Sequence, residues 1–173
     1  TIADTLGVVK GDDVREQQRN YVLKTVEERG VRLVRLWFTD VLGDLKSFAI
    51  SPAELDNALS DGMTFDGSSI DGFSRVQEAD VLAVPDPDTF EILPWGDSGA
   101  TEARVFCDIH HLDGTPFHGD PRQVLRRHVQ AAHAEGLTFY IAPDVEFFYF
   151  EQPQPGQPPR PLDAGGYFDL TTR

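Results

Sequence analysis

Two adjacent apolar runs near the start of the chain constrain its fold more than any other feature. Residues 31–40 read VRLVRLWFTD and residues 45–50 read LKSFAI, with Gly43 between them. β-Branched and aromatic residues are enriched in strands, and a short polar connection that contains glycine is typical of a hairpin. We therefore predict two strands joined by a turn over residues 40–44, which places this part of the chain in a β-sheet.

Three helices are predicted around these strands because each candidate has a start signal and a stop signal. Serine or aspartate can cap the N-terminus of a helix, proline is favoured at the first helical position, and glycine often ends a helix. The predicted helices run from Asp12 or Asp13 to about Arg29, from Ser51-Pro52 to near Gly62, and from Asp120-Pro121 to about Glu135.

Further strand candidates give the chain a mixed α+β pattern. They are residues 80–84, 89–93, 102–109, 137–142 and 144–150. A small mixed sheet with one packed helix fits residues 13–110. Residues 120–173 are predicted to begin another unit, because the strand at 144–150 needs partners that the chain barely supplies. Residues 152–161 read QPQPGQPPRP and are predicted to form an extended, mobile surface loop.

The charge of the chain excludes two classes of partner. Aspartate and glutamate total 29 against 15 lysine and arginine residues, which gives a formal net charge of −14. Such a chain repels nucleic acid and anionic membrane surfaces, so we expect neither as a partner. The single cysteine, Cys107, excludes an internal disulfide and is expected to be a buried core thiol. With no apolar run of membrane-spanning length and no signal peptide, a cytoplasmic protein is expected.

The segment DVEFFYF, residues 144–150, carries the clearest candidate for metal chemistry. On a strand, Asp144 and Glu146 point to the same face because side chains alternate. Paired carboxylates suit hard divalent cations, and they can serve two metals in one cluster. The alternative is an edge strand with one solvated face, and for an isolated D-x-E pattern that alternative is the commoner outcome.

Two segments that contain glycine are candidate substrate contacts. Residues 65–73 read FDGSSIDGF, in which Asp66 offers a charge while Ser68 and Ser69 offer hydroxyls. Residues 165–169 read GGYFD, where two glycines before the tyrosine permit close backbone approach. Taken alone, each segment is more typical of an ordinary turn, in which polar side chains bond their own backbone.

Other familiar site patterns are missing from the sequence. The five histidines lack the spacing of metal ligands, since His110 and His111 are adjacent and His128 and His133 do not share a helix face. There is no G-x-x-x-x-G-K-[ST] phosphate loop and no G-x-S-x-G nucleophile motif. A protein with this sequence that handles ATP does so without a P-loop.

Seven segments occur in an order that resembles the glutamine synthetases, and the fuller match resembles their bacterial type I branch. The segments are VRLVRLWFTDVLGDLKS, FDGSSIDGF, EADVLAVPDPDTFEILPW, ARVFCDI, GDPRQVLRR, DVEFFYF and LDAGGYFD. The resemblance covers about residues 15–172, and the ordered set is far more specific than any one motif. The resemblance implies a β-grasp domain over about residues 15–112, followed by the beginning of a catalytic domain over residues 113–173.

The resemblance also implies an activity and an assembly. In this family the γ-carboxylate of glutamate attacks the γ-phosphate of ATP, and ammonia then displaces phosphate from γ-glutamyl phosphate. Mg²⁺ or Mn²⁺ neutralises the charge that develops during phosphoryl transfer. The subunits form rings of six, usually stacked as twelve, and each active site lies between two subunits.

The metal ligands that the resemblance implies are Asp144 and Glu146, which correspond to the family's E-x-E-F-F strand. Glu146 matches the family pattern, whereas the family usually has glutamate at the position of Asp144. Because aspartate is one methylene shorter, we expect its metal to be held through a water or in a shifted position.

The remaining site residues that the resemblance implies come from the two glycine-bearing segments. Asp66, with Ser69 beside it, corresponds to the loop that reaches a neighbouring subunit, helps bind ammonium and takes its proton. Phe73 occupies an aromatic position near the neighbour's nucleotide. Tyr167 corresponds to a tyrosine near the ammonium pocket.

Two alternative functions stay open at this point. A ligase on the same scaffold could join glutamate to polyamines or other amines, because half of the residues that form the ammonium pocket are missing here. The other alternative is a non-catalytic assembly or regulatory module. Since the family's remaining metal ligands and substrate arginines are not among these residues, we expect no ligase activity from the 173 residues alone.

Overall fold

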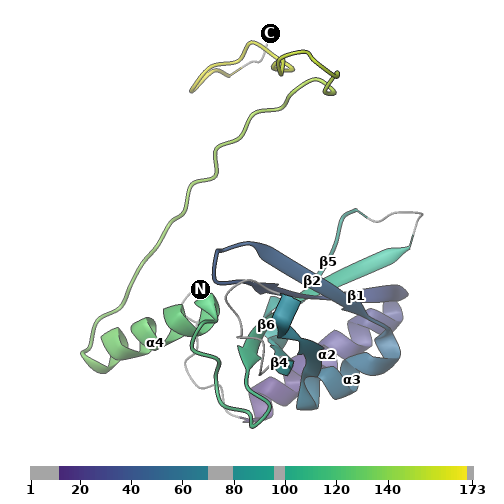
Figure 1. Ribbon diagram of the computed structural model, residues 1–173, viewed down its shortest axis with the longest axis vertical. Coiled ribbons are helices and arrows are strands. Elements are labelled where there is room, and N and C mark those ends of the chain that lie inside the picture. The colour runs from purple at the N-terminus through teal and green to yellow at the C-terminus, as the bar shows by residue number, and fades with distance from the viewer. Residues whose placement is uncertain (1–11, 70–79, 96–99, 171–173) are drawn as a thin grey trace. The chain divides into compact units, whose positions relative to one another are not determined.

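The computed structural model describes residues 12–69, 80–95 and 100–170. Its helices and strands (Figure 1) are α2 (Asp12–Glu28), β1 (Val31–Thr39), β2 (Leu45–Ile50), α3 (Pro52–Asp61), β3 (Met63–Asp66), β4 (Asp80–Pro85), β5 (Glu91–Ile92), β6 (Thr101–His110) and α4 (Pro121–Ala134). The chain divides into two units, one ending at Phe139 and the other beginning at Tyr140, which we describe separately.

The first unit is built on a sheet with the strand order β2-β1-β6-β4-β3, and β5 pairs with β6 beside this path. β1 and β6 are parallel, whereas the other pairs are antiparallel. Helices α2 and α3 contact each other and β1, and they lie on the same side of the sheet (Figure 1). The structure therefore confirms the α+β class. Within the described residues, no helix has both the length and the apolar character needed to cross a membrane.

Apolar side chains of the sheet and of these two helices form the core. Its most buried members include Val22 of α2, Leu55 of α3, Leu36 of β1 and Ile109 of β6. Cys107 lies in the same core, as predicted, and burial raises the pKa of its thiol. Each large apolar side chain that is fully buried stabilises a fold by about 1.5–3 kcal/mol, so this core supplies much of the unit's stability.

A buried carboxylate organises the hairpin between β1 and β2. Asp40 is 1% exposed, and its Oδ1 accepts hydrogen bonds from the backbone N–H groups of Leu42 (3.0 Å) and Asp44 (2.9 Å). Its Oδ2 lies 3.2 Å from Nζ of Lys46. Gly43 has a φ of +91°, a conformation that glycine adopts without strain. The predicted turn is confirmed, and its polar contacts fix the register of the hairpin.

Helix α4 is tied to the sheet through its capping residue. Asp120 is fully buried, and one carboxylate oxygen accepts from the backbone N–H of Arg122 at 3.0 Å. The other oxygen accepts from the backbone N–H of Ile109 in β6 at 2.9 Å. The predicted cap is therefore confirmed, and the same side chain joins the start of α4 to the middle of the sheet.

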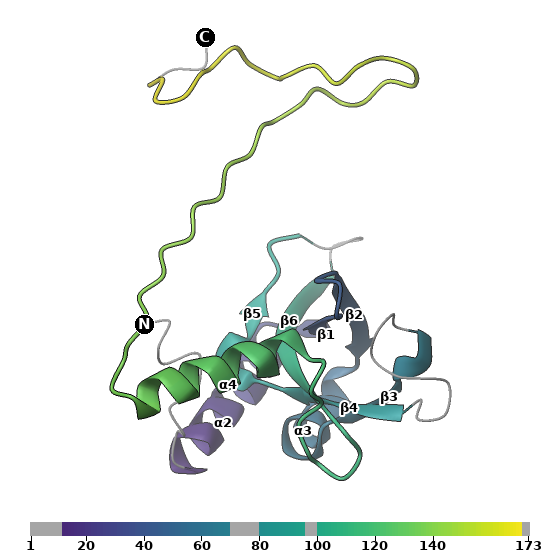
Figure 2. The same ribbon diagram turned by 60° about the vertical axis from the view of Figure 1, so that its left-hand side comes forward.

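Two parts of the sheet differ from the sequence prediction. The four-residue strand β3 was not predicted, but it pairs with β4 from Met63 to Asp66 and forms the sheet edge (Figure 2). The strand predicted over residues 89–93 is only two residues long, because the preceding residues Pro87–Thr89 form a 3₁₀ helix. Both segments are too short to give a periodic signal, so their structure depends on the strands beside them.

The predictions of strands at residues 137–142 and 144–150 are wrong. Residues 137–149 adopt no helix or strand. Among the described residues of the second unit, the only β pairing is an isolated bridge between Phe150 and Pro161. Hydrogen bonds from the N–H of Glu151 to the carbonyl of Arg160 and from that of Leu162 to Tyr149 close a loop around residues 152–161. A strand needs a neighbour for its backbone groups, and no backbone hydrogen bond to a neighbouring strand is described for residues 144–148.

Candidate functional site

Asp66 is exposed at the end of β3, the outermost strand of the sheet. The ring of Phe65, one residue earlier, packs 4.9 Å from that of Phe38 and 5.3 Å from that of Phe48, measured between centroids. Because side chains alternate along a strand, the packing of Phe65 directs Asp66 to the opposite side. The packing of these three aromatic rings therefore fixes the position of the end of β3, which carries the exposed carboxylate.

The carboxylate of Asp66 is held in a local turn that begins the 3₁₀ helix Gly67–Ser69. Its Oδ1 accepts from the hydroxyl of Ser68 at 2.6 Å and from the backbone N–H of the same residue at 2.9 Å. These bonds favour the charged form and lower the pKa of Asp66. Asp80 lies opposite Asp66 in the register of β3 and β4, so two acidic residues meet at this edge. The turn therefore presents an ionised carboxylate at neutral pH.

The resemblance implies two further site residues near this loop, Ser69 and Phe73. Ser69 ends the 3₁₀ helix, and its side chain lies outside the described residues. Phe73 also lies outside them.

Asp144 and Glu146 lie in the second unit, in the extended segment that forms no strand, and both are exposed. The common face predicted for them requires a strand, and residues 144–149 form none. Their carboxylates are the oxygen ligands that Mg²⁺ or Mn²⁺ prefers. Among the described residues, however, no three or more His, Cys, Asp or Glu side chains gather as a metal site. The donor pair therefore fits part of a metal centre, and further ligands are needed.

Tyr167 lies in a tight turn of the second unit and is 84% exposed. The backbone N–H of Gly166 donates to Oδ2 of Asp169 at 2.7 Å, and Phe168 has a φ of +66°, which is unusual for a bulky residue. The rings of Tyr167 and Phe168 lie 4.3 Å apart, centroid to centroid. Tyr167 thus shares a unit with Asp144 and Glu146, whereas Asp66 belongs to the first unit.

An ionic network that the sequence analysis missed joins α4 to the sheet. Arg122 donates through Nε to Oδ1 of Asp108 at 3.0 Å and through a terminal nitrogen to Oδ2 of Asp86 at 2.6 Å. Arg126 donates to the second oxygen of Asp108. Burial raises the pKa of Asp86, and the nearby Arg122 opposes that rise. The spacing of Arg122 and Arg126 by one helical turn was the available signal, but their partners come from separate strands and loops.

Comparison with known proteins decides the family. A model of the glutamine synthetase β-grasp domain matches residues 30–112, and a model of the glutamine synthetase catalytic domain matches residues 118–172. The chain belongs to the glutamine synthetase family. The first match covers the sheet with its α3 helix, which confirms the expected β-grasp domain. The second match begins just before α4 and continues through the segment that contains Asp144, Glu146 and Tyr167.

Individual glutamine synthetases and related structures agree with this assignment. The chain is 54% identical over 157 residues to the glutamine synthetase of Mycolicibacterium smegmatis, an alignment that covers 89% of this chain and 35% of the relative. A GmaS/ADP complex superposes with a TM-score of 0.59 at 26% identity, covering 66% of this chain and 26% of that one. Plasmodium falciparum glutamine synthetase has the same fold, with a TM-score of 0.62 at 24% identity over 70% of this chain and 23% of that one. The chain therefore spans 35% of the length of its curated relative.

Proposed function

We propose that these residues form the N-terminal part of an ATP-dependent glutamate–ammonia ligase that makes glutamine through γ-glutamyl phosphate. The observation that carries the proposal is the exposed, ionised carboxylate of Asp66 at the sheet edge of a glutamine synthetase-family chain. A fixed negative charge with access to solvent can serve a substrate cation outside its own fold. The GmaS/ADP complex supports an adenine nucleotide as the phosphoryl donor.

The lowered pKa of Asp66 favours one part of its proposed role over the other. A carboxylate that is already stabilised by two hydrogen bonds from Ser68 is a weak base but a good counter-ion for ammonium. Proton transfer from ammonium needs a more basic group, so Asp66 would take that proton only where another subunit removes its water and its local bonds. We therefore assign ammonium binding to Asp66 in the turn described above. Proton uptake is assigned to Asp66 only in the pocket that it would form with another subunit.

Asp144 and Glu146 are the residues that would hold Mg²⁺ or Mn²⁺ in the second half of the site. When bound, such a cation supplies positive charge to the oxygens of the transferring phosphoryl group. The contribution of the two carboxylates is to position that charge, and the exposed phenol of Tyr167 is proposed to line the ammonium pocket nearby. We also propose that the first unit of one copy meets the second unit of another in a ring, with glutamate, ATP and ammonium bound between them in the cytoplasm.

The role of Asp66 can be tested in a full-length synthetase that contains these residues. Asp66→Asn removes the charge and keeps the shape, so kcat/KM for ammonium should fall by about 10²-fold, with a smaller change in the KM for ATP. Asp61→Asn is the matched control, because Asp61 is an exposed carboxylate at the end of α3. An Asp66→Asn enzyme within twofold of the parent would contradict the assignment.

The metal ligands can be tested by restoring the residue usual in the family. Asp144→Glu should tighten Mn²⁺ binding in the full-length protein, because the longer side chain can reach the cation directly. Titration calorimetry measures this, with Asp163→Glu as a control at an exposed aspartate of the same unit. Unchanged Mn²⁺ affinity in Asp144→Glu would favour a solvated surface carboxylate.

An assay of the 173 residues alone tests whether they are sufficient for the ligase reaction. We expect no phosphate release with ATP, glutamate, ammonium and Mg²⁺, because the described residues supply only a pair of metal-binding carboxylates. Turnover at the rate of a full-length synthetase would contradict this. An amine panel on the full-length protein distinguishes ammonium from polyamines as the acceptor.

A further inference from the structure

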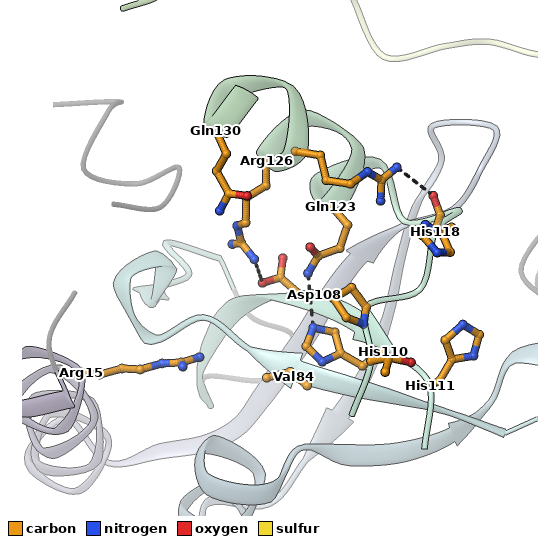
Figure 3. A pocket seen from close by; sticks show the side chains of 12 residues that line it. Arg15, Val84, Asp108, His110, His111, His118, Gln123, Arg126 and Gln130 are labelled. Atoms are coloured by element: carbon orange, nitrogen blue, oxygen red, sulfur yellow. Dashed lines mark hydrogen bonds and ion pairs between the residues drawn. The ribbon is translucent and has the colours of Figure 1, made fainter. Parts of the chain in front are cut away.

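A cavity of about 670 Å³ lies in the first unit, and none of the proposed ligase residues is among those that line it. Its wall comes from α2, β4, β6, the connection after β6 and α4 (Figure 3). A volume of this size is in the range of sites for small molecules. Neither Asp66 nor any residue of the second unit lines it.

The lining of this cavity is basic although the chain is strongly acidic. Among the described residues, three arginines and three histidines line it against one carboxylate, that of Asp108, in a chain with a net charge of −14. The arginines are Arg15 of α2 and Arg126 and Arg127 of α4. The segments that supply these side chains lie far apart in sequence, so the basic character arises only on folding.

The single carboxylate pairs with Arg126 but leaves Arg15 and Arg127 unneutralised, because both of its oxygens are already engaged. One oxygen of Asp108 accepts from Arg122 and the other accepts from Arg126. With the described residues, Arg127 makes only a long hydrogen bond of 3.5 Å, to the backbone carbonyl of His118. Within the described part of the chain, Arg15 makes no ion pair, and Figure 3 shows its side chain extending from α2 toward the cavity. Two guanidinium groups are therefore available to a ligand.

Neutral donors complete the lining. The amide of Gln123 is buried and lies 3.3 Å from Nε2 of His110, while the side chain of Gln130 extends from the next turns of α4 (Figure 3). Burial lowers the pKa of His110, the charge of Asp108 opposes this, and the cations Arg126 and Arg15 act with burial. The net effect of these surroundings is a lowered pKa of His110, and an anion bound in the cavity would raise that pKa.

We propose that this cavity binds a small oxyanion, either a phosphoryl group or a carboxylate-bearing molecule, through Arg15 and Arg127. The planar fork of a guanidinium matches both groups and forms paired charge-assisted hydrogen bonds with them. The ligand contacts α2, β6 and α4 at once, so its binding strengthens the attachment of α4 to the sheet. This site is separate from the proposed ligase function and does not depend on it.

The test uses the 173-residue protein, inorganic phosphate and NMR signals of the histidine side chains. At constant pH and ionic strength, phosphate should shift the His110 signal with saturation, whereas equal ionic strength from sodium chloride should not. Replacing both free arginines, Arg15→Gln with Arg127→Gln, should weaken phosphate binding by about tenfold or more, since each charge-assisted hydrogen bond contributes over 1 kcal/mol. Both side chains are exposed, so the fold should persist in this variant.

A matched control and a second ligand make the result decisive. Arg32→Gln removes an exposed arginine of β1 that does not line the cavity, and it should leave phosphate binding unchanged. Saturation by phosphate but not by succinate identifies a phosphoryl ligand, and saturation by both identifies oxyanions in general. The proposal is overturned if neither ligand gives a saturable shift of His110. It is also overturned if the double variant and Arg32→Gln bind phosphate equally.

Discussion

Residues 31–39 and residues 144–150 are both rich in strand-forming residues, yet they have different structures. VRLVRLWFT and DVEFFYF are both short, aromatic and rich in strand-forming residues. The first becomes β1, with β2 on one side and β6 on the other, and Leu36 at its centre is fully buried. The second forms no strand, and Val145 and Phe147 are 81% and 66% exposed. Strand propensity is thus expressed only where neighbouring strands supply hydrogen bonds and cover the apolar face.

The largest expected effect that tests this comparison is the loss of one apolar side chain in each region. Leu36→Ala should lower the free energy of unfolding by about 2–5 kcal/mol, because it removes buried contacts and leaves a cavity. Val145→Ala should change it by less than about 0.5 kcal/mol, since that side chain is exposed. Urea unfolding of the two variants measures both values. Equal destabilisation would mean that the second region is packed in solution.

A smaller effect tests what fixes β1 and β2 as a hairpin. Asp40→Ala should destabilise the protein by about 1–3 kcal/mol, because two backbone N–H groups lose a buried acceptor. Asp44→Ala removes a 70% exposed carboxylate from the same turn and should cost less than about 1 kcal/mol. Thermal unfolding compares the two. A milder effect of Asp40→Ala than of Asp44→Ala would show that the buried carboxylate does not organise the turn.

The smallest expected effect concerns the exposed edge of the sheet at Asp66. The hydrogen bonds from Ser68 lower the pKa of Asp66, so Ser68→Ala, which removes the hydroxyl, should raise that pKa toward the ordinary value. A lowered pKa means that the charged form stabilises the fold above the unfolded pKa, about 3.9, and that this contribution is lost as the pH falls through the folded value. NMR titration of the carboxyl groups measures the pKa of Asp66 in the parent protein and in Ser68→Ala. An identical titration midpoint would show that the hydroxyl does not set the charge of Asp66.

The comparison also explains how far the sequence could predict the fold. The hairpin and the three helices were predictable because their signals are local: Gly43 in the turn, Ser51 and Asp120 at helix starts. β3 was missed because four residues carry no period, and its pairing with β4 decides its structure. The strand at 144–150 was predicted from its aromatic and β-branched residues although few partners for it were evident, and without those partners it forms no strand.

The candidate site was predictable to the same degree. The loop pattern predicted both the carboxylate of Asp66 and the turn that holds it. The exposure of Asp66 agrees with its proposed role. The shared face of Asp144 and Glu146 depends on a strand that these residues do not form alone. The basic cavity was not predictable, because Arg15, His110 and Arg127 come together only through the packing of α2, β6 and α4.

The central claim is that the first unit folds on its own, whereas residues 144–149, the proposed metal-binding segment, become a strand only beside further residues of a catalytic domain. Amide hydrogen exchange tests it most directly, on this chain and on a chimera that continues into the catalytic domain of the Mycolicibacterium smegmatis glutamine synthetase. We expect residues 105–109 to be protected in both proteins and residues 144–149 to be protected only in the chimera. Protection of 144–149 in the 173-residue chain, or its absence from a folded chimera, would contradict the account.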